Sequence, residues 1–266
     1  MNGSCGRIAF GDNTNHAVIA TPPPRASTLF LFAENLARAG FRHGFASLAM
    51  DFGPLTPAPE VLANVQLLAA SIGFDAAALR QVNQVHGARV VDGATLESAA
   101  ARVEADALVL HAGSTDAVAA RAVGVRVADC VPVLVGSRGD GAVAAIHAGW
   151  RGVVAGVVGA ALRELGGGER VAAIGPCIGP CCFEVGADVA AQIAAACGDP
   201  RVVAERNGDK ALVDLRRAVR AQLAADGVTD VEDVPGCTRC EPARFFSYRR
   251  DGAKSGRHLA AIALRE

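Results

Sequence analysis

The sequence predicts an α+β domain, in which helices and strands are mixed along the chain. Short runs rich in Val, Ala and Ile alternate irregularly with longer segments of helical periodicity. A doubly wound parallel sheet would instead need a strict β-α-β rhythm. The chain of 266 residues contains no internal repeat, and its 51% of hydrophobic residues is enough to bury a substantial core.

Residues 1–28 are expected to form a poorly packed N-terminal extension. A polar run is followed there by the proline-rich segment TPPPRAST, which is typical of an extended linker. An ordered edge strand at 16–20 is the alternative. The rest of the chain, 29–266, is expected to be a single domain.

Five segments have helical character, and residues that start or stop helices lie at their ends. The segment 59–71 has apolar residues at the spacing of an amphipathic face. Asp214 is a candidate N-cap for the last helix, and glycines follow several of the others. The expected helices are 31–39, 59–71, 152–165, 186–196 and 213–225.

The predicted strands are short, and one of them carries unusual residues. The β-branched segment 125–135, VRVADCVPVLV, is interrupted by Asp129, Cys130 and Pro132. Because proline cannot donate to a ladder, Pro132 predicts an edge or a bulge. The other expected strands are 82–85, 88–91, 106–110, 117–120, 142–147, 171–175 and 259–264.

Composition excludes several classes of function. The 26 basic and 27 acidic residues give a net charge of −1, so we expect no nucleic-acid partner. No segment reaches the ~20 unbroken apolar residues of a membrane helix, and no signal-peptide pattern is present, so a cytoplasmic location is expected. The eight cysteines are then interpreted as thiols or metal ligands rather than disulfides.

Three potential metal ligands each lie beside the end of a predicted strand. They are His86 in QVHG, Cys130 in ADCVPV and His147 in IHAGWRG. One thiolate and two imidazoles suit zinc and leave its fourth position open, as in catalytic sites. Their sequence spacing does not require a common site, and the alternative is two hydrogen-bonded core histidines with an inert thiol.

These segments, with IGPCIGPCCFEVG at 174–186 and the CT…FFSYRRDG…GR region, resemble the YfiH family. This family also carries the laccase-domain and multicopper polyphenol oxidase labels and is described as a peptidoglycan editing factor; the match runs from about residue 34 to the end. The resemblance implies a single layered domain of mixed sheets flanked by helices, shared with certain bacterial toxin deamidases.

The resemblance also implies a function and a site. A zinc-dependent purine nucleoside phosphorylase is expected, which converts adenosine, inosine, guanosine or methylthioadenosine and phosphate into base and ribose 1-phosphate, with adenosine deaminase activity. His86, Cys130 and His147 correspond to the metal-binding and catalytic triad. Partners are therefore expected to be small molecules, and the oligomeric state is left open.

Two arginines are candidates for binding phosphate or substrate. Arg151 follows Trp150 at the start of a predicted helix, where free N–H groups favour anions. It either holds phosphate or pairs with Asp129 or a surface glutamate, while Trp150 either stacks on a purine or packs in the core. Arg249 either contacts substrate or lies on a solvated face.

Other functions remain open from the residues alone. Cys130 can be a nucleophile with His147 as its base, in a deamidase or hydrolase acting on amide or cell-wall peptide substrates. A zinc-stabilised, non-catalytic cell-wall editing factor is a further alternative. Copper polyphenol oxidation is the least supported, because the six histidines contain no HxH pair for a copper cluster.

Two features remain without an assigned role. Cys177, Cys181 and Cys182 precede CTRC at 237–240, so a second, Cys₄ zinc site is conceivable, although CxxxCC is an unusual partner for CxxC. After Phe45, the chain reads ASLAMDFGP, where similar sequences have an arginine-glycine loop and an asparagine in place of Ala49. The effect of this shortening on substrate range is left open.

Overall fold

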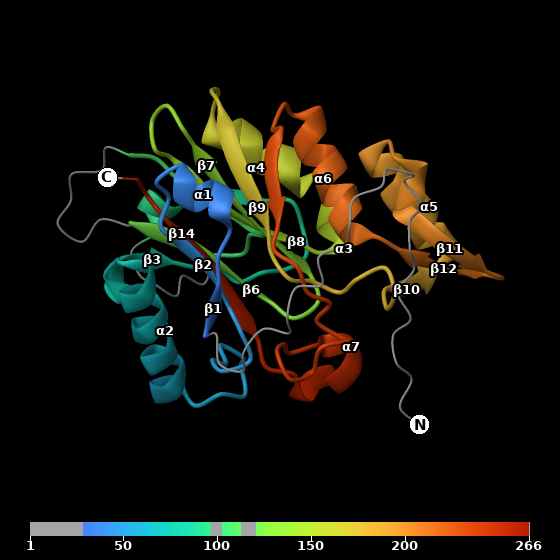
Figure 1. Ribbon diagram of the computed structural model, residues 1–266, viewed down its shortest axis with the longest axis horizontal. Coiled ribbons are helices and arrows are strands. Elements are labelled where there is room, and N and C mark those ends of the chain that lie inside the picture. Colours follow the sequence, from blue (N-terminus) through green and yellow to red (C-terminus); the bar gives the residue numbers. More distant parts are fainter. Residues whose placement is uncertain (1–28, 97–102, 113–120, 266) are drawn as a thin grey trace, which may run out of the picture.

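The computed structural model describes residues 29–96, 103–112 and 121–265, and these form four layers (Figure 1). Two β-sheets pack face to face in the middle. Helices α4 (Val157–Leu165) and α6 (Leu215–Ala225) cover the outer face of one sheet, and α2 (Ala58–Ile72) covers the outer face of the other. The predicted α+β class and the layered arrangement are both confirmed.

The larger sheet has six strands in the order β13-β9-β7-β8-β5-β4. It is mixed: β13 is parallel to β9 and β4 is parallel to β5, while the other pairs are antiparallel. The strands are β4 (Val90–Asp92), β5 (Ala107–Leu110), β7 (Val131–Ser137), β8 (Val143–Ala148), β9 (Arg170–Ile174) and β13 (Asp230–Asp233).

The second sheet has five strands in the order β1-β2-β14-β6-β3, with only β3 and β6 parallel. A third, antiparallel sheet of order β10-β12-β11 lies to one side (Figure 1). The strands are β1 (Phe30–Leu31), β2 (His43–Ala46), β3 (Leu79–Arg80), β6 (Ala122–Val127), β14 (His258–Ala263), β10 (Glu184–Gly186), β11 (Val203–Asn207) and β12 (Lys210–Val213).

Side-chain alternation explains why the strands are apolar along their whole length. In β7, Val133 and Val135 pack against the helix layer, whereas Leu134 faces the second sheet. In β14, Ile262 lies between the sheets and Leu259 faces α2. Strands that are covered on both faces need no polar side.

Short helices complete the fold. They are α1 (Glu34–Arg38), α3 (Trp150–Val154), α5 (Ala187–Cys197) and α7 (Tyr248–Asp251). The expected N-cap of α6 is confirmed, because the Asp214 carboxylate accepts a hydrogen bond from the Arg217 N–H at 2.9 Å. No helix in the part of the chain that the structure describes has both the length and the apolar character that a bilayer crossing requires.

Several predicted boundaries were wrong. The expected helix at 31–39 begins only at Glu34, because the preceding residues form β1. The helix at 152–165 is two helices, separated where Gly156 adopts φ +79°. No strand covers 82–85, where Asn83 forms a single bridge to Glu104. The expected extension 1–28, with its alternative strand at 16–20, and the expected strand 117–120 lie outside the described residues.

The segment 125–135 contains two strands that belong to different sheets. The three residues 128–130 connect β6 in the five-stranded sheet to β7 in the six-stranded one. The prediction that Pro132 marks an edge or a bulge was wrong, because β7 lies between β8 and β9. Pro132 is tolerated because β9 ends at Ile174, so no ladder bond to β9 needs an N–H from Pro132. The Pro132 carbonyl accepts the Gly175 N–H at 2.9 Å.

Candidate metal and substrate site

The three predicted ligands meet where the chain crosses from one sheet to the other. Cys130 directly precedes β7, and His147 lies opposite Pro132 on the neighbouring strand β8. His86 comes from the loop between β3 and β4. One ligand atom from each residue lies within 4.8 Å of the others, so the sequence prediction of their convergence is met. His147 is buried and His86 is exposed, so the cluster opens toward solvent.

The buried carboxylate of Asp106 holds two of these ligands in place. Its Oδ1 accepts hydrogen bonds from His147 Nδ1 at 2.7 Å and from the His86 backbone N–H at 2.8 Å. Its Oδ2 accepts the Gly87 and Val85 N–H groups at 2.6 Å and 3.3 Å. Because a carboxylate only accepts, Nδ1 of His147 carries the proton and Nε2 is available as a metal ligand.

The backbone around the cluster leaves space for its side chains. A Cβ at Gly149 would lie 3.0 Å from His86 Cδ2 and 3.2 Å from Cys130 Sγ. His86 and Asp129 are the two non-glycine residues with positive φ among the described residues, at 62° and 86°. Such conformations are uncommon for residues with a Cβ and concentrate at functional sites.

The electrostatics couple the thiol to the imidazoles. Burial alone would raise the pKa of the Cys130 thiol, but the charges and hydrogen bonds of His147 and His86 lower it to about 6. Burial alone would lower the pKa of His147, but the Cys130 thiolate and the Asp106 hydrogen bond raise it to about 9. At neutral pH these pKa values give a Cys130 thiolate beside a protonated His147, and a metal ion bound there would take the place of the His147 Nε2 proton.

The donor set fits a zinc ion better than a copper cluster. Two imidazole nitrogens and one thiolate, with the second nitrogen of His147 held by a carboxylate, make a typical three-residue zinc site. Among the described residues, His43 and His258 are buried against backbone groups, and His111 is exposed. These residues therefore offer no histidine cluster for several copper ions.

A cavity of about 530 Å³ opens beside the cluster and is lined by all three ligands. Phe183 and Tyr248 supply aromatic surface, and Pro54, from the shortened loop after Phe45, lies on the rim. The other lining residues are Asn83, Gln84, Arg126, Val127, Ala128, Asp129, Ile178, Arg249 and Arg257.

Arg126 and Arg257 both bring positive charge to this cavity. Burial, and then the charge of Arg257, lower the pKa of the Arg126 guanidinium. Neither guanidinium forms an ion pair with a carboxylate of residues 29–96, 103–112 or 121–265. Two cations that share a cavity without a carboxylate partner indicate a site for an anion.

The two arginines predicted from sequence have different positions. Arg249 lines the cavity, and its guanidinium donates to the Glu184 carbonyl at 3.0 Å and lies 5.5 Å from the Phe183 ring centroid. Arg151 is exposed on α3, with its guanidinium 4.5 Å from the centroid of Trp150, and it does not line the cavity. Trp150 is half-buried against the helix-layer core.

Asp129 ties the C-terminal segment to the site. Its Oδ1 accepts the Thr238 hydroxyl at 2.6 Å, and its Oδ2 accepts the Arg249 N–H at 2.6 Å. Adjacency to Cys130 in the sequence is, by itself, a reason to consider this carboxylate as a proton donor. With both oxygens accepting, it positions the loops around the cavity instead.

Sequence reasoning missed Asp106, Arg126 and Arg257. Asp106 did carry a signal, since a lone carboxylate at the start of the buried run ALVL needs a partner. The arginines carried none, because only the pairing of β6 with β14 brings residues 126 and 257 to the same cavity.

Fold and site together define a four-layer α+β protein with a His₂Cys cluster, which could hold a metal ion, beside a cationic cavity. The family model described as "Multi-copper polyphenol oxidoreductase laccase" matches residues 38–265, and the chain belongs to this family.

Named relatives are consistent with this assignment. A Streptomyces coelicolor protein named purine nucleoside phosphorylase SCO2081 is 42% identical over 198 residues, which cover 72% of this chain and 77% of that protein. A protein from an unknown prokaryotic organism named adenosine deaminase RL5 is 36% identical over 208 residues, covering 73% and 78%.

Solved structures share the fold. Neisseria meningitidis protein NMB0706 superposes with a TM-score of 0.77 at 31% identity, covering 90% of this chain and 100% of that one. The Bacillus licheniformis protein YfiH superposes with a TM-score of 0.76 at 24% identity, covering 90% and 97%. The predicted resemblance to the YfiH family is therefore confirmed.

Proposed function

We propose that this chain is a zinc-dependent purine nucleoside phosphorylase that also deaminates adenosine. The observation that carries the proposal is the convergence of His86, Cys130 and His147 beside a cavity lined by Arg126 and Arg257, neither of which is ion-paired with a carboxylate of the described residues. The names of relatives at about 40% identity support a purine nucleoside as substrate.

The proposed phosphorolysis exchanges one bond for another. An oxygen of inorganic phosphate bonds to C1′ of the ribose as the bond from C1′ to the purine nitrogen breaks, and a proton passes from phosphate to the departing base. In the deaminase reaction, water replaces the 6-amino group of adenosine, which leaves as ammonia. Both reactions need a polar or anionic nucleophile held beside a bound purine nucleoside.

The zinc ion would be held by His86, Cys130 and His147, and it would act as a Lewis acid that polarises a coordinated oxygen. The chain contributes the orientation of these ligands. Asp106 holds the His147 ring by its Nδ1–H and the His86 backbone by its N–H. The ligands are thus held in position before substrate arrives, which is what catalytic metal sites require.

The rest of the cavity supplies binding groups of the right chemistry. Arg126 and Arg257 would bind phosphate, and Arg249, which also lines the cavity, would contact phosphate or ribose. The rings of Phe183 and Tyr248 offer apolar faces for a purine. A phosphate role for Arg151 stays a prediction, and it would require its guanidinium to leave the Trp150 ring.

A chromatographic assay with inosine and phosphate tests the proposal. Wild-type protein is expected to release hypoxanthine and ribose 1-phosphate, and His86→Ala is expected to lower the rate by more than ~100-fold through loss of a metal ligand. His111→Ala changes an exposed histidine away from the cavity and is the matched control. Wild-type protein that holds stoichiometric zinc but releases no base would overturn the proposal.

A second candidate, cysteine-dependent amide hydrolysis, is favoured by one specific observation. Cys130, His147 and Asp106 form a thiolate–imidazole–carboxylate series, and the pKa of the thiol is lowered to about 6. If Cys130 is the nucleophile, an alkylating agent should inactivate metal-free, active enzyme by modifying it. If Cys130 is a metal ligand, zinc should protect it, and removal of zinc should abolish activity.

A further inference from the structure

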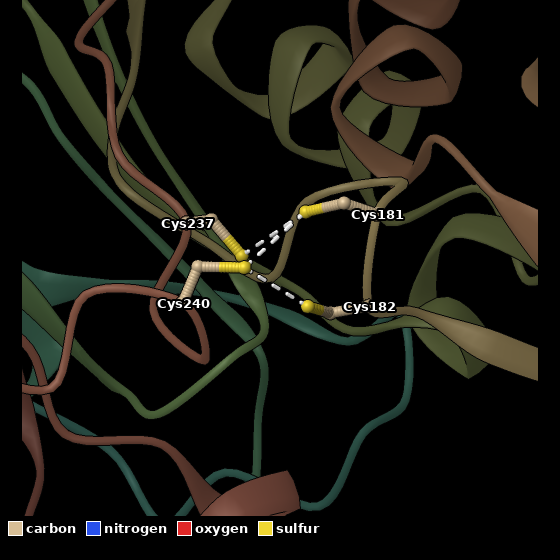
Figure 2. A group of neighbouring side chains, drawn as sticks. All are labelled: Cys181, Cys182, Cys237 and Cys240. Atoms are coloured by element: carbon tan, nitrogen blue, oxygen red, sulfur yellow. Dashed lines mark hydrogen bonds between the residues drawn. The ribbon is translucent and has the colours of Figure 1, made fainter. Parts of the chain in front are cut away.

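A second cluster of cysteines lies apart from the proposed catalytic triad. Cys181 and Cys182 come from the loop after β9, and Cys237 and Cys240 come from the loop after β13 (Figure 2). Because β9 and β13 are parallel neighbours, with Ile174 opposite Asp233, both loops leave the same edge of the sheet. The topology therefore brings a vicinal pair and a CxxC pair together.

All four sulfurs point toward a common centre (Figure 2). Their Sγ atoms lie within 4.8 Å of one another. The distances from Cys240 to Cys182 and to Cys181 are 3.1 Å and 3.5 Å, and that from Cys181 to Cys237 is 3.7 Å. A tetrahedral zinc site with Zn–S bonds of about 2.3 Å separates its sulfurs by about 3.8 Å, so a small closing or opening of each pair accommodates the ion.

A tight turn overcomes the unusual spacing of the vicinal pair. The Cys182 and Phe183 N–H groups both donate to the Gly179 carbonyl at 3.0 Å, which bends the chain around residues 180–182. Adjacent side chains, which would diverge in an extended strand, both face Cys240 here. The sequence spacing alone could not show this.

The surroundings supply positive charge and donors to the sulfurs. The Gly179 N–H donates to Cys237 Sγ at 3.2 Å. Arg239 lies between Cys237 and Cys240 in the chain, and its guanidinium hydrogen-bonds to the Cys182 thiol, which places a cation beside the sulfurs. Glu241 is the nearby acid, and it is paired with Arg244 and with the Cys237 N–H. A tetrathiolate carries excess negative charge, which Arg239 would partly offset.

We propose that Cys181, Cys182, Cys237 and Cys240 bind a second metal ion, a zinc held by four thiolates. On binding, the four thiols lose their protons to solvent and each sulfur forms one bond to the ion. All four positions of the ion are then filled by protein, so this site is structural rather than catalytic.

This second site would brace the wall of the substrate cavity. The loop with Cys181 and Cys182 also carries Ile178 and Phe183, which line the cavity. The loop with Cys237 carries Thr238, whose hydroxyl binds Asp129 at the cavity. The zinc would join these two loops to each other, so its loss should loosen the pocket without touching His86, Cys130 or His147.

Zinc content per chain tests the proposal and separates it from the proposed function. Purified under reducing conditions, wild-type protein is expected to hold two zinc ions per chain by elemental analysis. Cys240→Ser should lose one and Cys130→Ala should lose the other. Cys197→Ser, a cysteine on α5 outside both clusters, is the matched control and should lose none.

The outcomes are distinct. If only the catalytic assignment is wrong, Cys130→Ala keeps all of the wild-type zinc and Cys240→Ser still loses one ion. Equal zinc in Cys240→Ser and Cys197→Ser would overturn the second site. A Cys182–Cys240 disulfide, found by peptide mapping in protein purified under reducing conditions, would also overturn it.

Cobalt spectroscopy tests the same site in a protein whose four-cysteine cluster is intact. Cys130→Ala loaded with cobalt should show the intense thiolate-to-metal bands and tetrahedral d–d bands of a four-sulfur site. A weak, octahedral spectrum would overturn the proposal.

Discussion

Replacement of Asp106 by asparagine should remove hydrogen bonds that hold the proposed zinc ligands His86 and His147 in position, while leaving the shape of the site almost unchanged. The carboxylate accepts four hydrogen bonds, from His147 Nδ1 and from the N–H groups of Val85, His86 and Gly87. An asparagine side chain offers one acceptor oxygen and one NH₂ group. It cannot satisfy donors on both of its ends.

Each orientation of the amide has a definite cost. If its oxygen faces His147 and His86, the NH₂ group faces two part-buried N–H donors, of Gly87 and Val85. An unsatisfied donor costs about 1–3 kcal/mol when it is fully buried, so for these two part-buried donors the free energy of unfolding should fall by about 2 kcal/mol, the low end of that range. If the amide is reversed, its NH₂ group donates to His147 Nδ1, and Nε2 then carries the proton and cannot bind metal.

Both orientations should weaken zinc binding at the catalytic triad by about 10–100-fold, the usual effect of removing the partner of a ligating histidine. A competition titration with a chromophoric chelator measures this affinity, and chemical denaturation measures the stability. Asp92→Asn is the matched control: the Asp92 side chain accepts the Ala94 N–H in an exposed cap, a role that asparagine fills equally well. A folded Asp106→Asn protein with zinc affinity within about twofold of wild type would refute the positioning role.

Three further predictions test the cationic cavity, the space that Gly149 leaves for His86 and Cys130, and the buried His258. Arg126→Met should raise the KM for phosphate by at least ~10-fold at an unchanged KM for inosine, whereas Arg163→Met, an exposed change on α4, should not. Gly149→Ala keeps an allowed backbone, with φ −70°, but its methyl group crowds His86 and Cys130, so zinc affinity should fall by about tenfold. Gly139→Ala adds a methyl group in open space and should leave zinc affinity unchanged. Equal affinities in the two variants would contradict the need for space at Gly149. Burial lowers the pKa of His258 from 6.5 to about 4, so the unfolded chain binds the proton first on acidification, and stability present at neutral pH is lost as the pH falls from 6.5 toward 4. The free energy of unfolding, measured by denaturation at neutral pH and at about pH 4.5, should drop by about 2–3 kcal/mol less in His258→Gln than in wild type. Glutamine keeps an acceptor for the Phe246 N–H. Equal drops in the two proteins would refute the assignment to His258.

Much of the fold followed from local patterns, and the misses have physical causes. The helices α2, α5 and α6 were predicted almost to their ends, because each carries a regular apolar face. The small β10-β12-β11 sheet was missed because its strands are half exposed and polar, as in Glu184–Gly186. The division of 125–135 between two sheets depends on long-range pairing, which local propensity does not contain.

The cluster of His86, Cys130 and His147 depends on strand pairing in the same way. His147 is brought to Cys130 because β8 pairs with β7, and it is brought to Asp106 because β5 lies on the other side of β8. The His147 N–H donates to the Asp106 carbonyl at 2.7 Å, so backbone and side chain of one residue hold it twice. Sequence motifs could therefore name the ligands, whereas the residue that aligns them became visible only from the order of strands.

The crossing between the sheets explains why the site is placed there. The segment 128–130 must leave one sheet and enter the other, so its backbone groups are free of both ladders. They are used instead to bind neighbouring loops, as where the Asp129 carbonyl accepts the Ile178 N–H at 3.0 Å. Asp129 also holds Thr238, beside the second cysteine cluster. Loosening that cluster should therefore act on substrate binding through Asp129, raising KM more than it lowers zinc affinity at the triad.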